Sequence, residues 1–450
     1  MFINKEAVMH AMKIKNIKTQ TELAERIGMS KSQLSQMLSE DFCPVKTNVL
    51  NLMDALSISF DELIVSENAD EKEPIISEER EFKQVELLES LKIDRFSYKL
   101  DDYMDVAKVR PSKEYTVLET FAGAGGLALG LEEAGLHSVG AIEIDHLASK
   151  TLKKNRPNWS VIEGDINDIA KRGISNHELF NFSGELDVLS GGYPCQSFSY
   201  AGLRHGLNDI RGTLFYPYSQ ILRELKPKIF IAENVKGLVN HDEGRTLETM
   251  IQIFEESGYD ICWNILNSWD YDVAQKRERI VIIGIRNDLI KTQKYSFRFP
   301  EVSKNRPVLK DVLRDVPQSV GVGYSEKKRA ILEMVPPGGC WIDLPVEIAK
   351  DYMGASYNSG GGRRGMARRM SWDEPSLTLT TSPSQKQTER CHPSETRPFT
   401  VREYARIQSF PDEWTFEGGI GAQYKQIGNA VPVNLAKYVG LSVIKYLNQF

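Results

Sequence analysis

From residue 115 onward, short apolar runs alternate with stretches of helical pattern, and no other feature constrains the fold as strongly. Short apolar runs bounded by loop residues are typical of strands buried on both faces of a parallel sheet. The sequence therefore predicts an α/β fold with a doubly wound, largely parallel sheet. The strands are expected at residues 115–120, 139–143, 161–163, 187–191, 229–233 and 279–285.

The composition is that of a globular protein. Of 450 residues, 41% are hydrophobic and 26% are charged, which excludes collagen-like and disordered classes. The five cysteines are far apart and form no CxxC pair, so we expect no metal site, no disulfide framework and a cytoplasmic protein. No apolar run is long enough to span a bilayer, and residues 1–15 lack a signal-peptide core, so no membrane association is predicted.

The negative charge is concentrated in one segment. The formal net charge is −6, and the nine acidic and three basic residues between positions 67 and 89 account for all of it. Basic patches that bind nucleic acid are therefore compatible with the rest of the chain. Residues 67–112 are predicted to be an acidic linker, with one amphipathic helix at 82–91.

Residues 1–66 have the pattern of a small all-helical unit. Thr19 is placed to cap a helix, with Glu22 three residues on, and Gly28 ends that helix. A second helix at 31–38 follows after a short turn. A helical protein-interaction or dimerisation module is one interpretation, because the unit is not strongly basic.

The same layout resembles the Cro/phage-repressor type of helix-turn-helix domain. The resemblance implies that the helix at 31–38 enters the DNA major groove. Residues on its polar side would then contact base edges and phosphates. These residues are Lys31, Ser32, Gln33 and Gln36.

A glycine-rich turn follows the first predicted strand and opens a helix. Gly123, Gly125 and Ala128 have GxGxxA spacing, and Glu143 lies 20 residues after Gly123. Glycines allow the backbone to approach a ligand closely, and the acid can bind both ribose hydroxyls. Alone, this motif does not distinguish a dinucleotide site, an S-adenosylmethionine site and a purely structural turn.

Further polar groups are predicted at the same edge of the sheet. Cys195 follows the predicted strand at 187–191, and Glu233 is the last residue of the strand at 229–233. Arg277 and Arg279 stand at the start of the strand at 279–285. Each residue alone has a structural interpretation, as a core cysteine, an ion pair or a surface charge. Together they suit covalent attack on an electron-poor ring.

Six blocks in order resemble the DNA (cytosine-5) methyltransferases. They are FAGAGG, GGYPCQSFSYAG, ENV, QKRERI, RPFTVREYARIQSFPDEW and QIGNAVPV. The resemblance implies a Rossmann-like S-adenosylmethionine-dependent methyltransferase fold, fused to the N-terminal all-α helix-turn-helix domain. It implies a catalytic domain at 113–299, a small inserted target recognition domain at 300–395 and a C-terminal return to the catalytic domain at 396–450.

The resemblance also implies a mechanism on duplex DNA. Cys195 would attack C6 of a flipped cytosine, and Glu233 would contact the ring N3 and amino group. C5 would then take the methyl group, while Arg277 and Arg279 would stabilise the loop and the flipped nucleotide. The expected function is methylation of a short specific site, as in a restriction-modification system.

The resemblance also implies which parts of the chain bind S-adenosylmethionine. They are the glycine turn, Glu143 at the ribose, Asp165 and Ile166 beside the adenine, and the C-terminal block. Residues 119–126 are expected to touch residues 426–431. The chain departs from the family at Glu119, Ile144 and Ala201, and adenine packing is expected to differ because of Ile144. The implied cofactor residues are Phe121, Gly123, Gly125, Gly126, Glu143, Asp165, Ile166, Pro194, Leu214 and Asn429.

Within the inserted segment, four arginines lie among glycines. A flexible basic strip suits phosphate contacts or guanine readout, and a solvated loop is the alternative. These arginines are Arg363, Arg364, Arg368 and Arg369.

Three other functions remain open on the sequence. They are a catalytically silent DNA-binding regulator, a nicotinamide-dependent oxidoreductase and a tRNA methyltransferase of the same family. The oxidoreductase hypothesis explains the glycine turn and Glu143 but assigns no role to the PCQ, ENV and QKRER residues. The expected partner is double-stranded DNA; a cognate restriction endonuclease, a dimer through the N-terminal unit and transcriptional autoregulation are further expectations.

Overall fold

The computed structural model describes residues 103–194, 213–358 and 365–450. In the N-terminal part it describes residues 2–3, 5–15, 17, 19–27, 34, 38, 55–56 and 64–65. The chain divides into two compact units, Met1–Ser97 and Tyr98–Phe450.

The N-terminal unit contains helices α1 (Lys5–Ile14) and α2 (Gln20–Arg26) and a two-stranded antiparallel pair, β1 (Phe2–Ile3) and β2 (Ile64–Val65). The predicted cap is present, because the Thr19 hydroxyl accepts a hydrogen bond from the Glu22 backbone N–H at 3.2 Å. Of the second predicted helix only Leu34 and Leu38 are described, and both are buried. Lys31, Ser32, Gln33, Gln36 and the helix at 82–91 lie outside the described residues.

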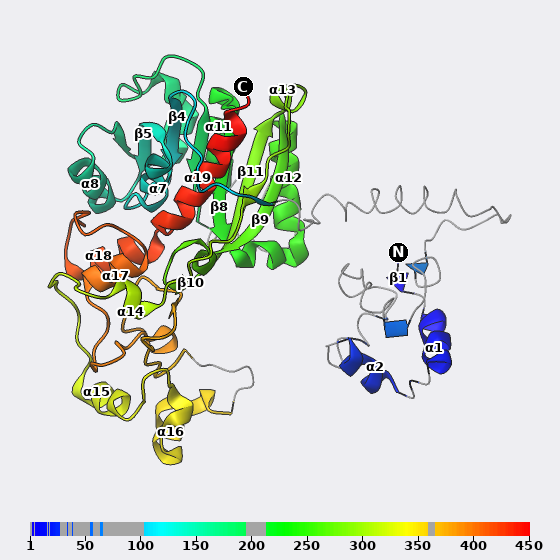
Figure 1. The fold of residues 1–450 in the computed structure, drawn as a ribbon, viewed down its shortest axis with the longest axis vertical. Coiled ribbons are helices and arrows are strands. Elements are labelled where there is room, and N and C mark those ends of the chain that lie inside the picture. The colour runs from blue at the N-terminus through cyan, green and yellow to red at the C-terminus, as the bar shows by residue number, and fades with distance from the viewer. Residues whose placement is uncertain are drawn as a thin grey trace. The chain divides into compact units, whose positions relative to one another are not determined.

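The large unit is built on a seven-stranded sheet in the order β6-β5-β4-β7-β8-β11-β9 (Figure 1). The first five strands in this order are mutually parallel. This confirms the predicted α/β class. The parallel strands are β4 (Tyr115–Thr120), β5 (Leu136–Glu143), β6 (Val161–Glu163), β7 (Val188–Gly191) and β8 (Ile229–Val235).

The other side of the sheet was predicted incompletely. Strand β11 (Glu278–Arg286) is antiparallel to both β8 and β9 (Tyr259–Asn267), and the sequence pattern did not indicate β9. As the last strand of the sheet, β9 is only half-buried along most of its length. Polar residues such as Asp260 and Asn264 therefore interrupt the apolar run that marks the inner strands.

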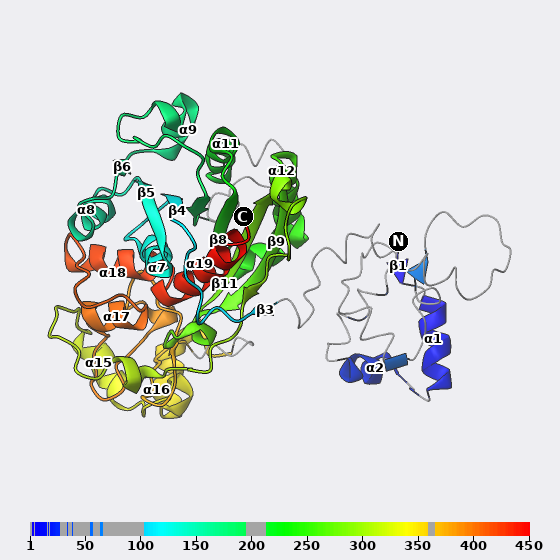
Figure 2. The ribbon, with the colours of Figure 1, turned by 45° about the horizontal axis from the view of Figure 1, so that its top comes forward.

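Helices cover both faces of the sheet (Figure 2). On one face, α7 (Gly126–Ala134) and α19 (Val433–Leu447) share a core with Val117 and Val188. Side chains alternate between faces along a strand, so Phe230 points to the other face, where it packs on Phe254 with ring centroids 4.3 Å apart. Helices on that face include α11 (Phe215–Leu225) and α12 (Arg245–Glu256); α8 (His146–Asn155) and α9 (Ile166–Arg172) flank the β6 edge.

Residues 300–395 have little regular structure and their own small core. Helices α15 (Glu326–Glu333) and α16 (Val346–Met353) pack around Leu332, Met353 and Cys391. This segment joins the sheet unit through a short parallel pairing of β13 (Ser376–Leu377) with β10 (Gln275–Lys276). Further elements are α13 (Asn287–Ile290), α14 (Leu309–Val312), α17 (Val401–Ile407), α18 (Ile420–Asn429), β3 (Tyr103–Met104) and β12 (Phe299–Pro300).

Among the residues that the structure describes, one stretch, Ile420–Leu447, is long and apolar enough to cross a membrane by length and composition alone. It consists of two helices, α18 and α19, separated by a break that contains Pro432. Most of it is buried against the rest of the protein, as core helices of soluble proteins are.

Candidate active site

Two charged side chains meet where β8 ends and β11 begins. Arg279 Nε lies 2.8 Å from a carboxylate oxygen of Glu233, and both side chains are almost buried, at 12% and 13% exposure. The antiparallel register of β8 and β11 pairs Val281 with Glu233 and so brings the two charges to one edge. The structure therefore joins two of the predicted catalytic residues in one ion pair.

Arg277 lies beside this pair and is 3% exposed. Its guanidinium donates to the carbonyl oxygens of Leu379 and Gly428, at 3.1 and 3.0 Å. Burial, and then the positive charge of Arg279, lower the pKa of Arg277 to about 9. Arg277 thus connects β10 to the inserted segment and to the end of α18.

Two buried glutamines, which the sequence did not single out, strengthen this junction. The Gln275 amide donates to the Gln408 side chain at 2.8 Å and accepts from the Leu379 backbone N–H at 2.8 Å. Gln408 in turn donates to the Ile427 carbonyl. Glutamine is common on surfaces, so only its complete burial here reveals the role.

Asn234 connects the ion pair to the loop that carries the predicted nucleophile. Its side-chain amide, which is buried, donates to the Tyr193 carbonyl at 2.8 Å. Pro194, which follows Tyr193, is exposed. Cys195 and Ala201 lie outside the described residues. The chain therefore approaches position 195 from a backbone fixed beside Glu233.

The glycine turn between β4 and α7 has the left-handed conformation at three positions: Phe121, Gly123 and Gly125 have φ of 55°, 54° and 86°. Glu143 holds this turn, because its carboxylate accepts from the Gly123 N–H at 2.6 Å and from the Asp145 N–H at 2.7 Å. Burial raises the pKa of Glu143, and these hydrogen bonds oppose the shift.

The turn offers room for a ligand on one side and is closed on the other. No atom lies within 4 Å of where a Cβ would stand on Gly123, whereas a Cβ on Gly126 would lie 2.2 Å from the Val431 carbonyl. The predicted contact between residues 119–126 and 426–431 is therefore confirmed. Asn429 is exposed, Leu214 is half-buried and Ile144 is 65% exposed, so the surface around the turn is accessible.

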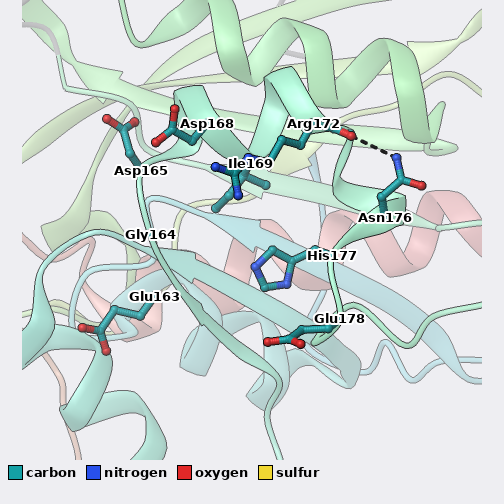
Figure 3. A pocket seen from close by; sticks show the side chains of 10 residues that line it. Glu163, Gly164, Asp165, Asp168, Ile169, Arg172, Asn176, His177 and Glu178 are labelled. Carbon is teal, nitrogen blue, oxygen red and sulfur yellow. Dashed lines mark hydrogen bonds between the residues drawn. The ribbon is translucent and has the colours of Figure 1, made fainter.

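A pocket of about 430 Å³ lies beside the end of β6 (Figure 3). Asp165 lines it and also caps α9 by accepting from the Asn167 N–H at 2.8 Å. Ile166, the other residue of the predicted adenine pair, is buried and does not line this pocket. The lining residues are Glu163, Gly164, Asp165, Asp168, Ile169, Arg172, Gly173, Asn176, His177 and Glu178.

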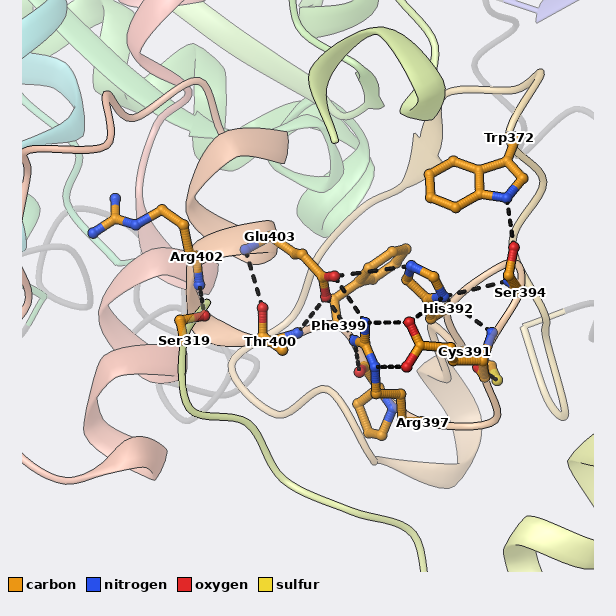
Figure 4. Close-up of polar contacts among 12 residues, drawn as sticks. Ser319, Trp372, Cys391, His392, Ser394, Arg397, Phe399, Thr400, Arg402 and Glu403 are labelled. Carbon is orange, nitrogen blue, oxygen red and sulfur yellow. Dashed lines mark hydrogen bonds and ion pairs between the residues drawn. The ribbon is translucent and has the colours of Figure 1, made fainter. Parts of the chain in front are cut away.

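A charged cluster at the start of α17 is structural (Figure 4). Arg397 donates two hydrogen bonds to Glu403, at 2.7 and 2.9 Å, and two to Glu395. Glu403 also accepts from the Thr400 backbone N–H at the helix cap. Among the residues that the structure describes, no group of three His, Cys, Asp or Glu side chains is arranged to hold a metal ion.

The four arginines of the predicted basic strip differ in what the structure shows of them. Arg363 and Arg364 lie outside the described residues. Arg369 is 5% exposed, and its guanidinium donates to the carbonyls of Leu332 and Val335 and to two further oxygens. The prediction of Arg369 as a DNA contact is therefore wrong, because the side chain is buried and four of its five N–H donors bind oxygens inside the protein. Arg368 keeps a partly exposed side chain.

Comparisons with known proteins agree with this arrangement. A family model described as C-5 cytosine-specific DNA methylase matches residues 115–445, and a helix-turn-helix model matches residues 9–63. The chain is 63% identical to the Type II methyltransferase M.Sau96I of Staphylococcus aureus, over 100% of both chains. It is 48% identical to the Type II methyltransferase M.Eco47II of Escherichia coli, over 92% of this chain and 98% of that one.

Solved structures show the fold. The crystal structure of the S. pombe Dnmt2 methyltransferase superposes with a TM-score of 0.52 at 16% identity, covering 74% of this chain and 100% of that one. The resemblance seen in the six sequence blocks is confirmed, and the oxidoreductase alternative is excluded by the family match. The chain belongs to the C-5 cytosine-specific DNA methylases, with a helix-turn-helix domain ahead of the methylase domain.

Proposed function

We propose that this enzyme is a cytoplasmic Type II methyltransferase that methylates C5 of cytosine in one short duplex DNA site. The observation that carries the proposal is the Glu233–Arg279 ion pair beside Asn234, which binds the backbone two residues before Cys195. The hydrogen bond to Tyr193 and the ion pair lie at one strand edge, which supports the assignment of Cys195 and Glu233 to one site for nucleophilic attack on a cytosine ring.

In this mechanism Cys195 is the nucleophile and Glu233 the ring contact. The Cys195 thiolate forms a bond to C6, while Glu233 hydrogen-bonds N3 and the amino group and favours protonation of the ring. After C5 has been methylated, a base removes the C5 proton, the bond between C6 and sulfur breaks, and the thiolate leaves. Arg279 fixes the Glu233 carboxylate, and Arg277 fixes the loops around the flipped nucleotide.

S-Adenosylmethionine fits the open side of the glycine turn and supplies the methyl group as an electrophile when bound. The space above Gly123 and the orientation of the Glu143 carboxylate support this assignment. Each Glu143 oxygen accepts one backbone N–H and keeps a further acceptor site for a ribose hydroxyl. We assign Phe121 to the adenine or methionine moiety and Pro194 to the methionine end, while Gly123, Gly125 and Gly126 allow close approach of the backbone. Asp165 and Ile166 flank the adenine, and Leu214 and Asn429 are further lining positions.

The test is bisulfite sequencing of DNA from cells that express the wild type or Cys195→Ala. We expect new 5-methylcytosine in one short motif with the wild type and none with the variant. Cys195→Ala that methylates as well as the wild type would overturn the mechanism. Wild-type protein that binds S-adenosylmethionine but methylates no DNA would favour the silent regulator or an RNA substrate.

A second function is favoured by the helix-turn-helix match over residues 9–63. We propose that residues 1–66 bind an operator, with Lys31, Ser32, Gln33 and Gln36 on the reading helix, and repress transcription of the gene itself. Such domains often bind two half-sites as dimers. Full-length protein should footprint a promoter outside the methylated motif, and Gln33→Ala should abolish that footprint. We also propose that a cognate restriction endonuclease acts on the DNA site that this enzyme methylates.

A further inference from the structure

The inserted segment holds a buried carboxylate that the proposed chemistry does not use. Glu389 is 0% exposed and forms an ion pair with Lys328. Its other oxygen accepts from the Tyr352 hydroxyl at 2.8 Å and from the Ala367 backbone N–H at 2.6 Å. A buried carboxylate is tolerated only when it is paired and hydrogen-bonded. Glu389 meets that condition by fixing α15, α16 and the backbone at Ala367 together.

A second buried charge fixes the same backbone two residues later. The Arg369 guanidinium donates to four oxygens, three of them backbone carbonyls. At the other end of the segment, a Cβ on Gly365 would lie 2.7 Å from the Gln387 carbonyl, so the backbone there is too close-packed for any side chain. The backbone of residues 365–369 is therefore held on both sides of Arg368.

Arg368 itself has donors to spare. Among the described residues it forms an ion pair with Glu374 that is long, at 3.4 Å, and the Glu374 side chain is 55% exposed, so the pair is weak. Its Nε is buried and has no hydrogen-bond partner among the described residues. An arginine on a fixed backbone with unused donors is prepared to bind an external acceptor.

A chain of contacts connects Arg368 with Arg277 beside the Glu233 site. The Arg368 carbonyl accepts a hydrogen bond at 3.0 Å from the backbone N–H of Cys391, the residue after Arg390. Burial and, as a smaller cause, the positive charge of Arg368 lower the pKa of Arg390 to about 10. Arg390 donates to the Thr378 carbonyl and Arg277 to that of the next residue, Leu379. A row of positive groups thus leads from Arg277 to Arg368.

Building on the proposed function, we propose that Arg368 reads a guanine in the DNA target and that Glu389 is the positioning residue that holds it there. A planar guanidinium can donate to O6 and N7 of guanine together, which distinguishes guanine from the other bases in the major groove. This two-point contact requires a backbone that does not move, and the Glu389 and Arg369 bonds provide one.

The test uses full-length protein and duplex oligonucleotides that carry the methylated motif, mapped by bisulfite sequencing. Each guanine of the motif is replaced in turn by 7-deazaguanine, which lacks the N7 acceptor. We expect the wild type to lose about 10- to 100-fold in kcat/KM at one guanine. Arg368→Ala should show a similar loss on unmodified DNA and no further loss at that guanine. Arg329→Ala, which removes an exposed arginine of α15, should behave as the wild type.

Glu389→Gln tests the positioning role. We expect a higher KM for DNA and a weaker preference for guanine over 7-deazaguanine, with the KM for S-adenosylmethionine unchanged. If Glu389→Gln does not fold, Arg368→Lys decides, because lysine keeps the charge without the planar donor pair and should bind DNA yet lose the sensitivity. If the wild type is active and Arg368→Ala loses as much activity as the wild type when that guanine is replaced by 7-deazaguanine, this inference alone is overturned. Wild type that methylates no DNA would overturn the proposed function as well.

Discussion

The strand edge and the inserted segment fix polar side chains by different means. At the strand edge, Glu233 and Arg279 are placed by strands that pair over seven residues, so backbone hydrogen bonds determine their positions. In the inserted segment, β13 pairs over two residues only, and Glu389 and Arg369 hold the chain through side-chain bonds to the backbone. The difference indicates that losing one polar side chain should affect chemistry at the strand edge and stability in the inserted segment.

The largest expected effect is on catalysis at the strand edge. Glu233→Gln should lower kcat by about 100-fold or more, because the amide cannot favour ring protonation as the carboxylate does. The amide oxygen of Gln can still accept from Arg279 and the register of β8 and β11 does not depend on this side chain, so the free energy of unfolding should fall by less than in Arg369→Ala. Methyl transfer from labelled S-adenosylmethionine and urea denaturation measure the two quantities. A large loss of stability would contradict the comparison.

Arg369→Ala should show the opposite behaviour. Three backbone carbonyls lose their buried donor, so we expect the free energy of unfolding to fall by about 3 kcal/mol. The control is Arg329→Ala, whose side chain is 64% exposed and should cost little. Equal stabilities of the two variants in urea would show that the inserted segment does not rely on buried side-chain bonds.

Gln275→Leu tests the junction between the two regions. Leucine leaves the Leu379 N–H and the Gln408 amide without their buried partner, and we expect a loss of about 2 kcal/mol together with a lower kcat. Gln252→Leu on the exposed side of α12 is the matched control. If kcat is unchanged while stability falls, the junction stabilises the fold but does not determine the position of Arg277.

The smallest effect concerns pH. Burial, and then the charge of Arg397, lower the pKa of His392 below its ordinary value of 6.5. The unfolded chain therefore binds this proton more readily than the folded protein, so stability is complete above pH 6.5 and falls as the pH drops below it. His392→Asn keeps an acceptor for the Ser394 and Glu395 N–H groups. Its melting temperature should fall less than that of the wild type between pH 7 and 5; parallel curves would exclude His392 as the cause.

The predicted catalytic edge depended on a simple pattern, because β4 and β6 were expected from their short apolar runs and lie where these runs indicated. Strand β9 was missed because a half-buried edge strand does not produce a continuous apolar run. Arg369 was misassigned because neighbouring arginines look alike in sequence. Only packing against Leu332 and Val335 distinguishes it from Arg368.

The sequence by itself determined the α/β class, the family and the strand edge to which Glu233 belongs. Local periodicity and loop position are sufficient for these, since parallel strands must place their carboxyl ends together. Arg277 and Arg279 stand at the start of β11 and reach the same edge only because β11 is antiparallel to β8, which the tertiary structure decided. The tertiary structure alone decided which polar side chains are consumed by the protein and which keep free donors. That outcome depends on contacts between residues far apart in the chain, such as Gln275 with Gln408, and no local pattern contains them.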